Sequence, residues 1–350
     1  MKRVILLAAC FIGCSSTAPR DGFEEPPATP PPVEEPPPAS FPPPACNETS
    51  NTGEPVVYAH AALLKKNEKG QGAWTNWLAV FDPKTLAVRE WISLESCKDG
   101  LLDMAVDRKG RIFFAGANGY FWFDAQAKTC TRIVGAHEAP DGTMHYVNPP
   151  NNLTFAPAKL FEPNAAEDDE VLVGFGLKLK DDTDMTSGEA GFLRIEPETG
   201  ATTIVNPFVA NSPAWELWPS GDLVSVVDRC EKRAVTWATV IGDKKKSLCR
   251  ACEEGMQPGL DCGDCLYELD MRTGSFGKNL GLLPYDGVFG VTFWGGTLVG
   301  FDYKGKIFTI DPKVSPPATK ELAFTAPEGV ESVSFMGAGS TTIAPLTNVN

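Results

Sequence analysis

The chain has 350 residues, of which 43% are apolar and 22% are charged, so it can bury a large globular core. Its formal net charge of −14 argues against a nucleic-acid surface, because such a surface needs clustered positive charge. The same charge disfavours direct adsorption to anionic lipid.

The N-terminus has the pattern of an export signal over residues 1–13: a basic start, then an apolar run at 4–12 that is too short to span a bilayer as a helix. The run ends in FIGC, which resembles a bacterial lipobox and implies lipidation of Cys14 and membrane anchoring. The sequence LAAC that ends at Cys10 matches the lipobox better, but the apolar segment before it is too short for an export signal. Ser15 after the lipidated cysteine favours the outer membrane. An ordinary cleaved signal is the alternative.

A proline-rich segment follows. Residues 14–45 contain twelve prolines, and proline fixes φ and removes the backbone donor. We therefore expect a disordered, extended tether that reaches up to roughly 100 Å at about 3.1 Å per residue. The folded domain is predicted to occupy residues 46–350.

One signature recurs five times in the folded part: a β-rich run that ends in an acidic residue, followed by a turn. Intervals of 41 and 42 residues match one four-stranded propeller blade, and the intervals of 72 and 74 match a blade with an insertion. Five signatures predict an all-β propeller of five blades, with six as the alternative. The acidic residues are Asp82, Asp124, Glu196, Asp270 and Asp311.

A second signature is a Gly-centred turn before a β-rich run, at 107–114, 220–224 and 295–299. The segment Met104–Phe113 resembles the repeat of NHL and SMP-30/gluconolactonase-like propellers. That resemblance implies the propeller fold. It also implies a divalent metal held near the axis by Glu, Asn and Asp, but no residue here matches those ligands position by position.

Numbering the strands within each blade predicts where the loops lie. If each acidic residue ends the outermost strand, segments 56–64 and 77–82 supply two strands of one blade, and segments 319–325 and 330–336 complete it. Insertions are then expected near 137–189 and 229–264. The long loops predicted at 137–149, 181–189 and 228–264 fall on one face, which suggests a composite binding surface.

Eight cysteines remain after Cys14 is lipidated and the signal is removed, and an exported chain is expected to pair them as four disulfides of unknown connectivity. The doubled CxxC motif makes zinc the alternative, with Cys249, Cys252, Cys262 and Cys265 as ligands. Under the strand labels, Cys97 and Cys130 lie at opposite faces and are predicted not to pair. The eight are Cys46, Cys97, Cys130, Cys230, Cys249, Cys252, Cys262 and Cys265.

No catalytic motif is present in the sequence. His60 is interpreted as structural, and His137 and His145, near Glu138 and Asp141, as surface residues rather than a metal or acid–base site. The acidic stretches near 167–170 and 181–184 lack the EF-hand pattern, so a solvated surface is favoured over calcium.

Together these features predict an exported, lipid-anchored propeller on the periplasmic or surface side of the outer membrane. We expect it to act as a binding or scaffold module for an envelope protein or small ligand, without nucleic acid and without a favoured cofactor. The alternative is a lactonase- or hydrolase-like enzyme with a metal at the propeller axis. Fold alone does not decide between the two.

Overall fold

A computed structural model of the chain describes residues 57–66, 70–150, 152–166, 169–185, 187–207, 217–228, 233–242 and 263–344. The chain divides into two units, Met1–Cys46 and Asn47–Asn350, and every described residue belongs to the second. Over these residues, regular structure is almost all β-strand, with two short 3-10 helices, η1 (Glu95–Cys97) and η2 (Ala158–Leu160). No helix in the described ranges is long and apolar enough to cross a membrane.

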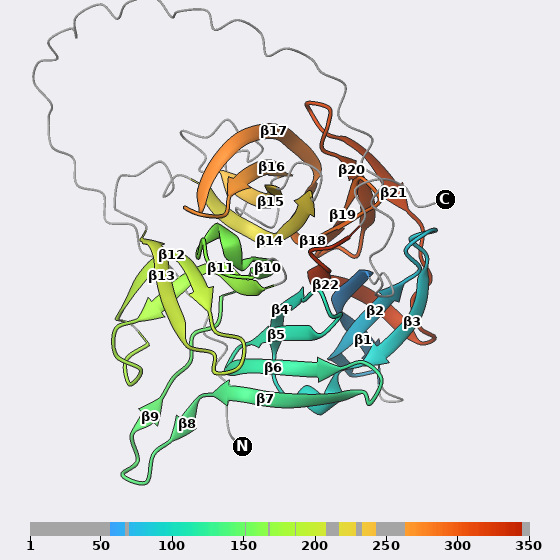
Figure 1. The fold of residues 1–350 in the computed structure, drawn as a ribbon. Coiled ribbons are helices and arrows are strands. Elements are labelled where there is room, and N and C mark those ends of the chain that lie inside the picture. The colour runs from blue at the N-terminus through green and yellow to red at the C-terminus, as the bar shows by residue number, and fades with distance from the viewer. Residues whose placement is uncertain are drawn as a thin grey trace, which may run out of the picture. The chain divides into compact units, whose positions relative to one another are not determined.

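The strands form five four-stranded antiparallel sheets, the blades of a five-bladed β-propeller, as predicted (Figure 1). The first strand of each sheet lies at the centre of the ring and the last at its rim. From the inside outward, blade 1 is β22 (Val330–Ser340), β1 (Val57–Lys66), β2 (Gly72–Phe81) and β3 (Val88–Ser93); blade 2 is β4 (Leu101–Val106), β5 (Ile112–Gly116), β6 (Gly119–Asp124) and β7 (Thr129–Gly135); blade 3 is β10 (Thr154–Pro157), β11 (Glu170–Leu179), β12 (Gly188–Ile195) and β13 (Thr202–Pro207); blade 4 is β14 (Leu217–Asp228), β15 (Arg233–Gly242), β16 (Gly263–Asp270) and β17 (Ser275–Asp286); blade 5 is β18 (Val288–Trp294), β19 (Thr297–Asp302), β20 (Ile307–Asp311) and β21 (Ala318–Leu322).

Blade 1 closes the ring by joining the two ends of the domain. The C-terminal β22 pairs with β1, so the C-terminus supplies one strand and the N-terminal part supplies three. The prediction of two strands from each end is wrong, because β21 belongs to blade 5. Closure gives β1 a hydrogen-bonded neighbour on both sides, β22 and β2, so its edge is not left unpaired.

The acidic turn residues end the third strand of each blade, not the fourth as predicted. Asp82 follows β2, and its Oδ1 accepts hydrogen bonds from the amides of Lys84 and Thr85, both at 2.9 Å. Asp124 at the end of β6 does the same for Gln126 and Ala127 at 2.8 and 2.9 Å. An Asx turn of this kind can follow any strand of a blade. The acidic signature therefore does not show which of the four strands it ends.

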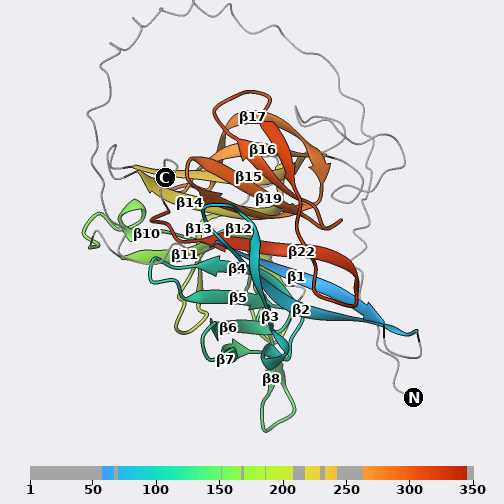
Figure 2. The ribbon, with the colours of Figure 1, turned by 90° about the vertical axis from the view of Figure 1, so that its right-hand side faces the viewer.

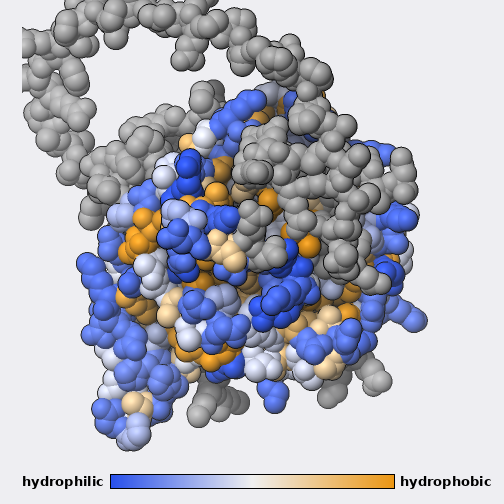
Figure 3. Space-filling model, viewed as in Figure 1, coloured by the Kyte–Doolittle hydropathy of each residue, from blue (hydrophilic) through white to orange (hydrophobic). Residues whose placement is uncertain are grey.

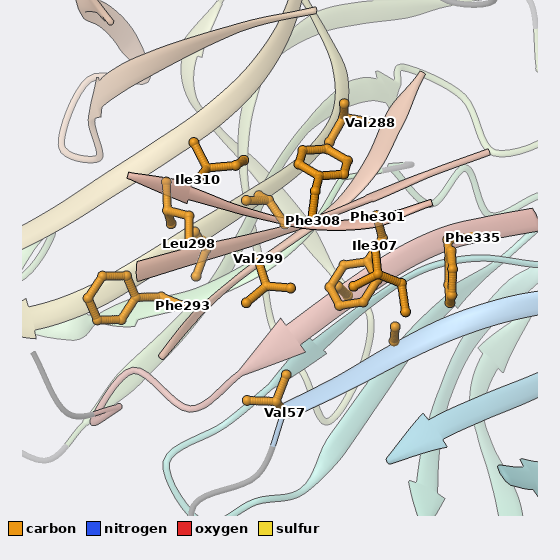
Figure 4. Close-up of a cluster of buried hydrophobic side chains, with 14 of the residues drawn as sticks. Val57, Val288, Phe293, Leu298, Val299, Phe301, Ile307, Phe308, Ile310 and Phe335 are labelled. Atoms are coloured by element: carbon orange, nitrogen blue, oxygen red, sulfur yellow. The ribbon is translucent and has the colours of Figure 1, made fainter. Parts of the chain in front are cut away.

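Burial decreases from the inside of a blade to its rim. All five residues of β5 are buried, whereas none of the seven in β7 is. Aromatic rings fill the space between blades. Phe301 of β19 packs edge-on against Phe81 of β2 at 5.4 Å. Phe301 also lies 5.2 Å from Phe335 of β22 (Figure 4). These three rings are at most 1% exposed, so blades 5 and 1 share one dry core.

Gly221 lies within a strand rather than in the predicted turn. The predicted Gly-centred turn at 220–224 is instead the irregular part of the inner strand β14, where the pairing with β15 shifts between Pro219 and Leu223. A Cβ on Gly221 would lie 1.9 Å from the carbonyl oxygen of Val288. Glycine is needed here because the backbone of blade 5 approaches closely.

The long connections lie on one face, as predicted, although the strand labels shift by one. Connections between second and third strands, and those between blades, emerge on the same side, which we call the insertion face. The connections 136–153, 180–187 and 243–262 all attach there. The predicted insertions were too wide, because 137–189 contains β10 and β11, and 229–264 contains β15.

Cys97 and Cys130 form a disulfide, so the prediction that they do not pair is wrong. Their Cα atoms are 4.8 Å apart. Both cysteines lie at the rim, after β3 and in β7, rather than beside inner strands as the labels had placed them. The turn after β3 folds against the start of β7, where Ser96 Oγ contacts the Lys128 carbonyl at 3.3 Å and the Cys130 amide at 3.2 Å. The bridge links blades 1 and 2.

Candidate functional site

A hairpin and a loop from neighbouring blades meet on the insertion face. The connection from blade 2 to blade 3 contains the hairpin of β8 (His137–Glu138) and β9 (Met144–His145), and the β11–β12 loop of blade 3 spans 180–187. The hairpin projects from the ring in both ribbon views (Figures 1 and 2). In Figure 3 the same projection is largely hydrophilic. We call the hairpin together with this loop the projecting site.

Two contacts join the two parts of the projecting site. The amide of Tyr146 donates to the backbone carbonyl of Asp182 at 2.6 Å, and His145 Nδ1 lies 3.0 Å from Asp182 Oδ2. The imidazoles of His137 and His145 stack across the hairpin, with ring centroids 5.1 Å apart and planes 12° apart. The site therefore has two imidazoles held beside a carboxylate that comes from another blade.

The sequence placed His137 and His145 in one loop with Glu138 and Asp141 but did not include Asp182 in that group. Asp141 instead shapes the hairpin turn, since its Oδ1 accepts from the Thr143 amide at 2.9 Å. Asp182 was missed because 37 residues separate it from His145. Only the packing of adjacent blades brings the two together.

A second cluster of polar residues lies at the propeller axis, on inner strands. Asp222 Oδ2 accepts hydrogen bonds from Val291 of blade 5 and Ala338 of blade 1, at 2.9 and 3.1 Å. Asp103 Oδ2 accepts from the amide of Leu153, which leads into blade 3, at 2.6 Å. Asp103 belongs to blade 2 and Asp222 to blade 4, so the two side chains together contact all five blades.

Asp103 and Asp222 are also hydrogen-bonded to each other, and both are fully buried. Burial, and then the charge of Asp222, raises the pKa of Asp103 well above its ordinary value. Asp103 Oδ1 receives no hydrogen bond from any N–H group. Burial raises the pKa of Asp222 too, but its hydrogen bond with Asp103 lowers the pKa of Asp222 and raises that of Asp103, so we assign the proton of the pair to Asp103 and Asp222 remains the acceptor of backbone amides.

The axial pair does not fit a divalent metal. A cation needs free carboxylate lone pairs, whereas three of the four oxygens here accept hydrogen bonds from backbone N–H groups and one carboxyl holds a proton. In the described part of the chain, no three His, Cys, Asp or Glu side chains are arranged to hold a metal. The axial carboxyls bind backbone amides of neighbouring strands, and they give no support to the alternative of a lactonase-like enzyme with a metal at the axis.

The end of the propeller axis that lies opposite the insertion face is covered by the residues after β22. The backbone carbonyl of Thr342 accepts from Val227 of blade 4 at 2.8 Å, and its hydroxyl donates to Glu170 Oε1 of blade 3. Glu170 Oε2 accepts from the Arg108 amide of blade 2 at 2.8 Å. Burial raises the pKa of Glu170 to about 7. This end is closed by the chain itself.

His60 is fully buried in β1, consistent with the structural interpretation. Its Nε2 lies 3.1 Å from Asn76 Oδ1, and its ring packs edge-on to Phe114. Burial lowers the pKa of His60 to about 4, so the ring is neutral at physiological pH.

The remaining predicted cysteines are only partly covered by the structure. Cys265 in β16 is buried and disulfide-bonded. The zinc alternative stays a prediction, since three of its four ligands are not described. The predicted residues outside the described ranges are Cys14, Cys46, Cys230, Cys249, Cys252 and Cys262.

Comparisons with known proteins extend only to the fold. No family model matches the sequence, and the search of curated proteins gives no match. A gluconolactonase from Xanthomonas campestris is 13% identical, with 78% of each chain covered and a TM-score of 0.36. An α-L-arabinanase from Penicillium chrysogenum is 10% identical over 81% of this chain and 88% of that one, with a TM-score of 0.35. The Dos1 propeller is 12% identical over 77% and 75%, with a TM-score of 0.29. Such distant likeness transfers no activity.

Proposed function

We propose that this propeller is a lipid-anchored binding module of the bacterial envelope and that it engages its ligand through the insertion face. The observation that carries the proposal is the projecting site, where segments from two blades join at the His145–Asp182 contact. A rigid ring that holds long polar loops on one face suits recognition. The acidic composition and the predicted anchor at Cys14 support placement at a membrane without direct adsorption to it.

The test is capture of envelope partners by cross-linking, using the anchored protein and two variants. In the first variant a two-residue turn replaces 138–144, which removes the tip of the hairpin. The matched control replaces the exposed turn 83–86 on the opposite face with a turn of equal length. We expect loss of captured partners with the first variant alone. Equal capture by both variants would contradict the assignment of the binding face.

The anchor is tested separately. A Cys14→Ser variant is expected to lose acyl labelling and to leave the membrane fraction. Retention of label in this variant would refute lipidation at Cys14.

A further inference from the structure

The projecting site contains two histidines whose proton positions are fixed by their neighbours. His137 Nδ1 lies 3.2 Å from the backbone carbonyl of Gly135. A carbonyl only accepts hydrogen bonds, so Nδ1 carries the proton. In the neutral ring the lone pair then resides on Nε2.

His145 has the same arrangement with a different acceptor. Its Nδ1 lies 3.0 Å from Asp182 Oδ2, and a carboxylate accepts. Nε2 of His145 therefore also carries a lone pair when the ring is neutral. Imidazoles that bind metals through one nitrogen almost always donate the other N–H to a carbonyl or carboxylate, and these two rings show both versions.

The two imidazoles lie on the same face of the hairpin. His137 and His145 are direct cross-strand partners, and side chains at such positions share a face. Asp182 is exposed, with 61% of its side chain accessible, and His145 is at 31%. The charges of Asp141 and Asp181 also interact with His145, so the surroundings favour a cation.

We propose that His137 and His145 bind a divalent transition metal through Nε2, with Asp182 as the residue that positions His145. Imidazole ligands select Cu²⁺ or Zn²⁺ over Mg²⁺ or Ca²⁺, and Cu²⁺ binds such a pair more tightly than Zn²⁺. The protein supplies two ligands and water completes the coordination. Binding requires the rings to tilt out of their parallel stack so that the lone pairs converge. This inference does not depend on the proposed envelope ligand.

The test is calorimetric titration of the full-length protein with CuSO₄ and then ZnSO₄ in a metal-free, non-coordinating buffer at pH 7.5. We expect His137→Gln and His145→Gln each to remove one bound ion per chain relative to the unaltered protein. Asp182→Asn should weaken that ion by about tenfold, the usual effect of losing a residue that orients a ligand. Comparing variants with the unaltered protein isolates this ion from any bound at the cysteine-rich segment.

Glu138→Gln is the matched control, because Glu138 is adjacent to His137 in β8 and so points to the other face of the hairpin. This variant should bind as the unaltered protein does. Unchanged stoichiometry and affinity in both histidine variants, with unaltered circular dichroism, would overturn the proposal.

Discussion

The axial carboxyl pair gives a sharp test, because the same substitution should have opposite consequences at its two positions. Asp222 is an acceptor of three backbone amides: Leu223 at 2.6 Å, Val291 at 2.9 Å and Ala338 at 3.1 Å. In Asp222→Asn, one carboxylate oxygen becomes an NH₂ donor. Whichever way the amide is turned, at least one buried N–H loses its acceptor and faces another donor.

Each buried N–H left without an acceptor costs about 1–3 kcal/mol, and hydrogen bonds to a charged group are worth about 1.5–3 kcal/mol. We therefore expect Asp222→Asn to lower the free energy of unfolding by about 3 kcal/mol. Asp103→Asn keeps an oxygen for the Leu153 amide, and its NH₂ donates to Asp222 in place of the carboxyl proton. Its stability at pH 7 should lie within about 1 kcal/mol of the unaltered protein.

The assay is urea unfolding followed by tryptophan fluorescence, from pH 4 to pH 8. The folded protein holds a proton on Asp103 that the unfolded chain releases above about pH 3.9, so stability falls as pH rises towards the raised pKa. Asp103→Asn should flatten that fall. Equal destabilisation by the two asparagine variants, or an unchanged pH dependence in Asp103→Asn, would refute the assignment of proton and charge.

Three further predictions concern other parts of the ring. Glu170 has its pKa raised from 4.5 to about 7, so it adds to the fall in stability as pH rises through that range, and Glu170→Gln should remove this part of the fall in urea titrations. Replacing Cys97 and Cys130 with serine should cost about 3–4 kcal/mol, as expected for a closed loop of this length, and a peptide map of the unaltered protein should contain their cross-linked fragment. Gly221→Ala should lower the melting temperature and reduce the free energy of unfolding by about 3 kcal/mol, since the new Cβ would lie 1.9 Å from a carbonyl oxygen. Gly277→Ala is the control and should leave stability nearly unchanged, because its Cβ would meet nothing closer than 3.4 Å.

The blade count could be predicted from the sequence because each blade has an acidic residue before a turn, and in four of the five blades the side chain of this residue caps the turn. Strand order within the blade could not, since a turn beside Asp82 has the same chemistry whichever two strands it joins. Gly221 was misassigned for a similar reason: glycine is required both in a tight turn and where another backbone approaches closely. In this chain, local sequence patterns predict turns and strands but not which of the four strands of a blade each one is.

The axial pair had no signal that sequence reasoning could use. Asp103 interrupts an apolar strand, which is equally typical of a polar residue on an exposed edge. Its partner Asp222 is 119 residues away. The contact exists only because inner strands of non-adjacent blades meet at the centre of the ring. The same reasoning applies to Asp182 and His145, which share a site through the packing of blades 2 and 3.

The closure by a single C-terminal strand has a consequence for biosynthesis. β1 ends at Lys66, and its inner neighbour β22 begins only at Val330, so the first blade remains incomplete until the four other blades have been made. During that interval β1 exposes an unpaired edge and an apolar surface, both of which promote aggregation or proteolysis. Prematurely terminated chains would lack β22 altogether. Completion of blade 1 therefore requires that translation has passed β22.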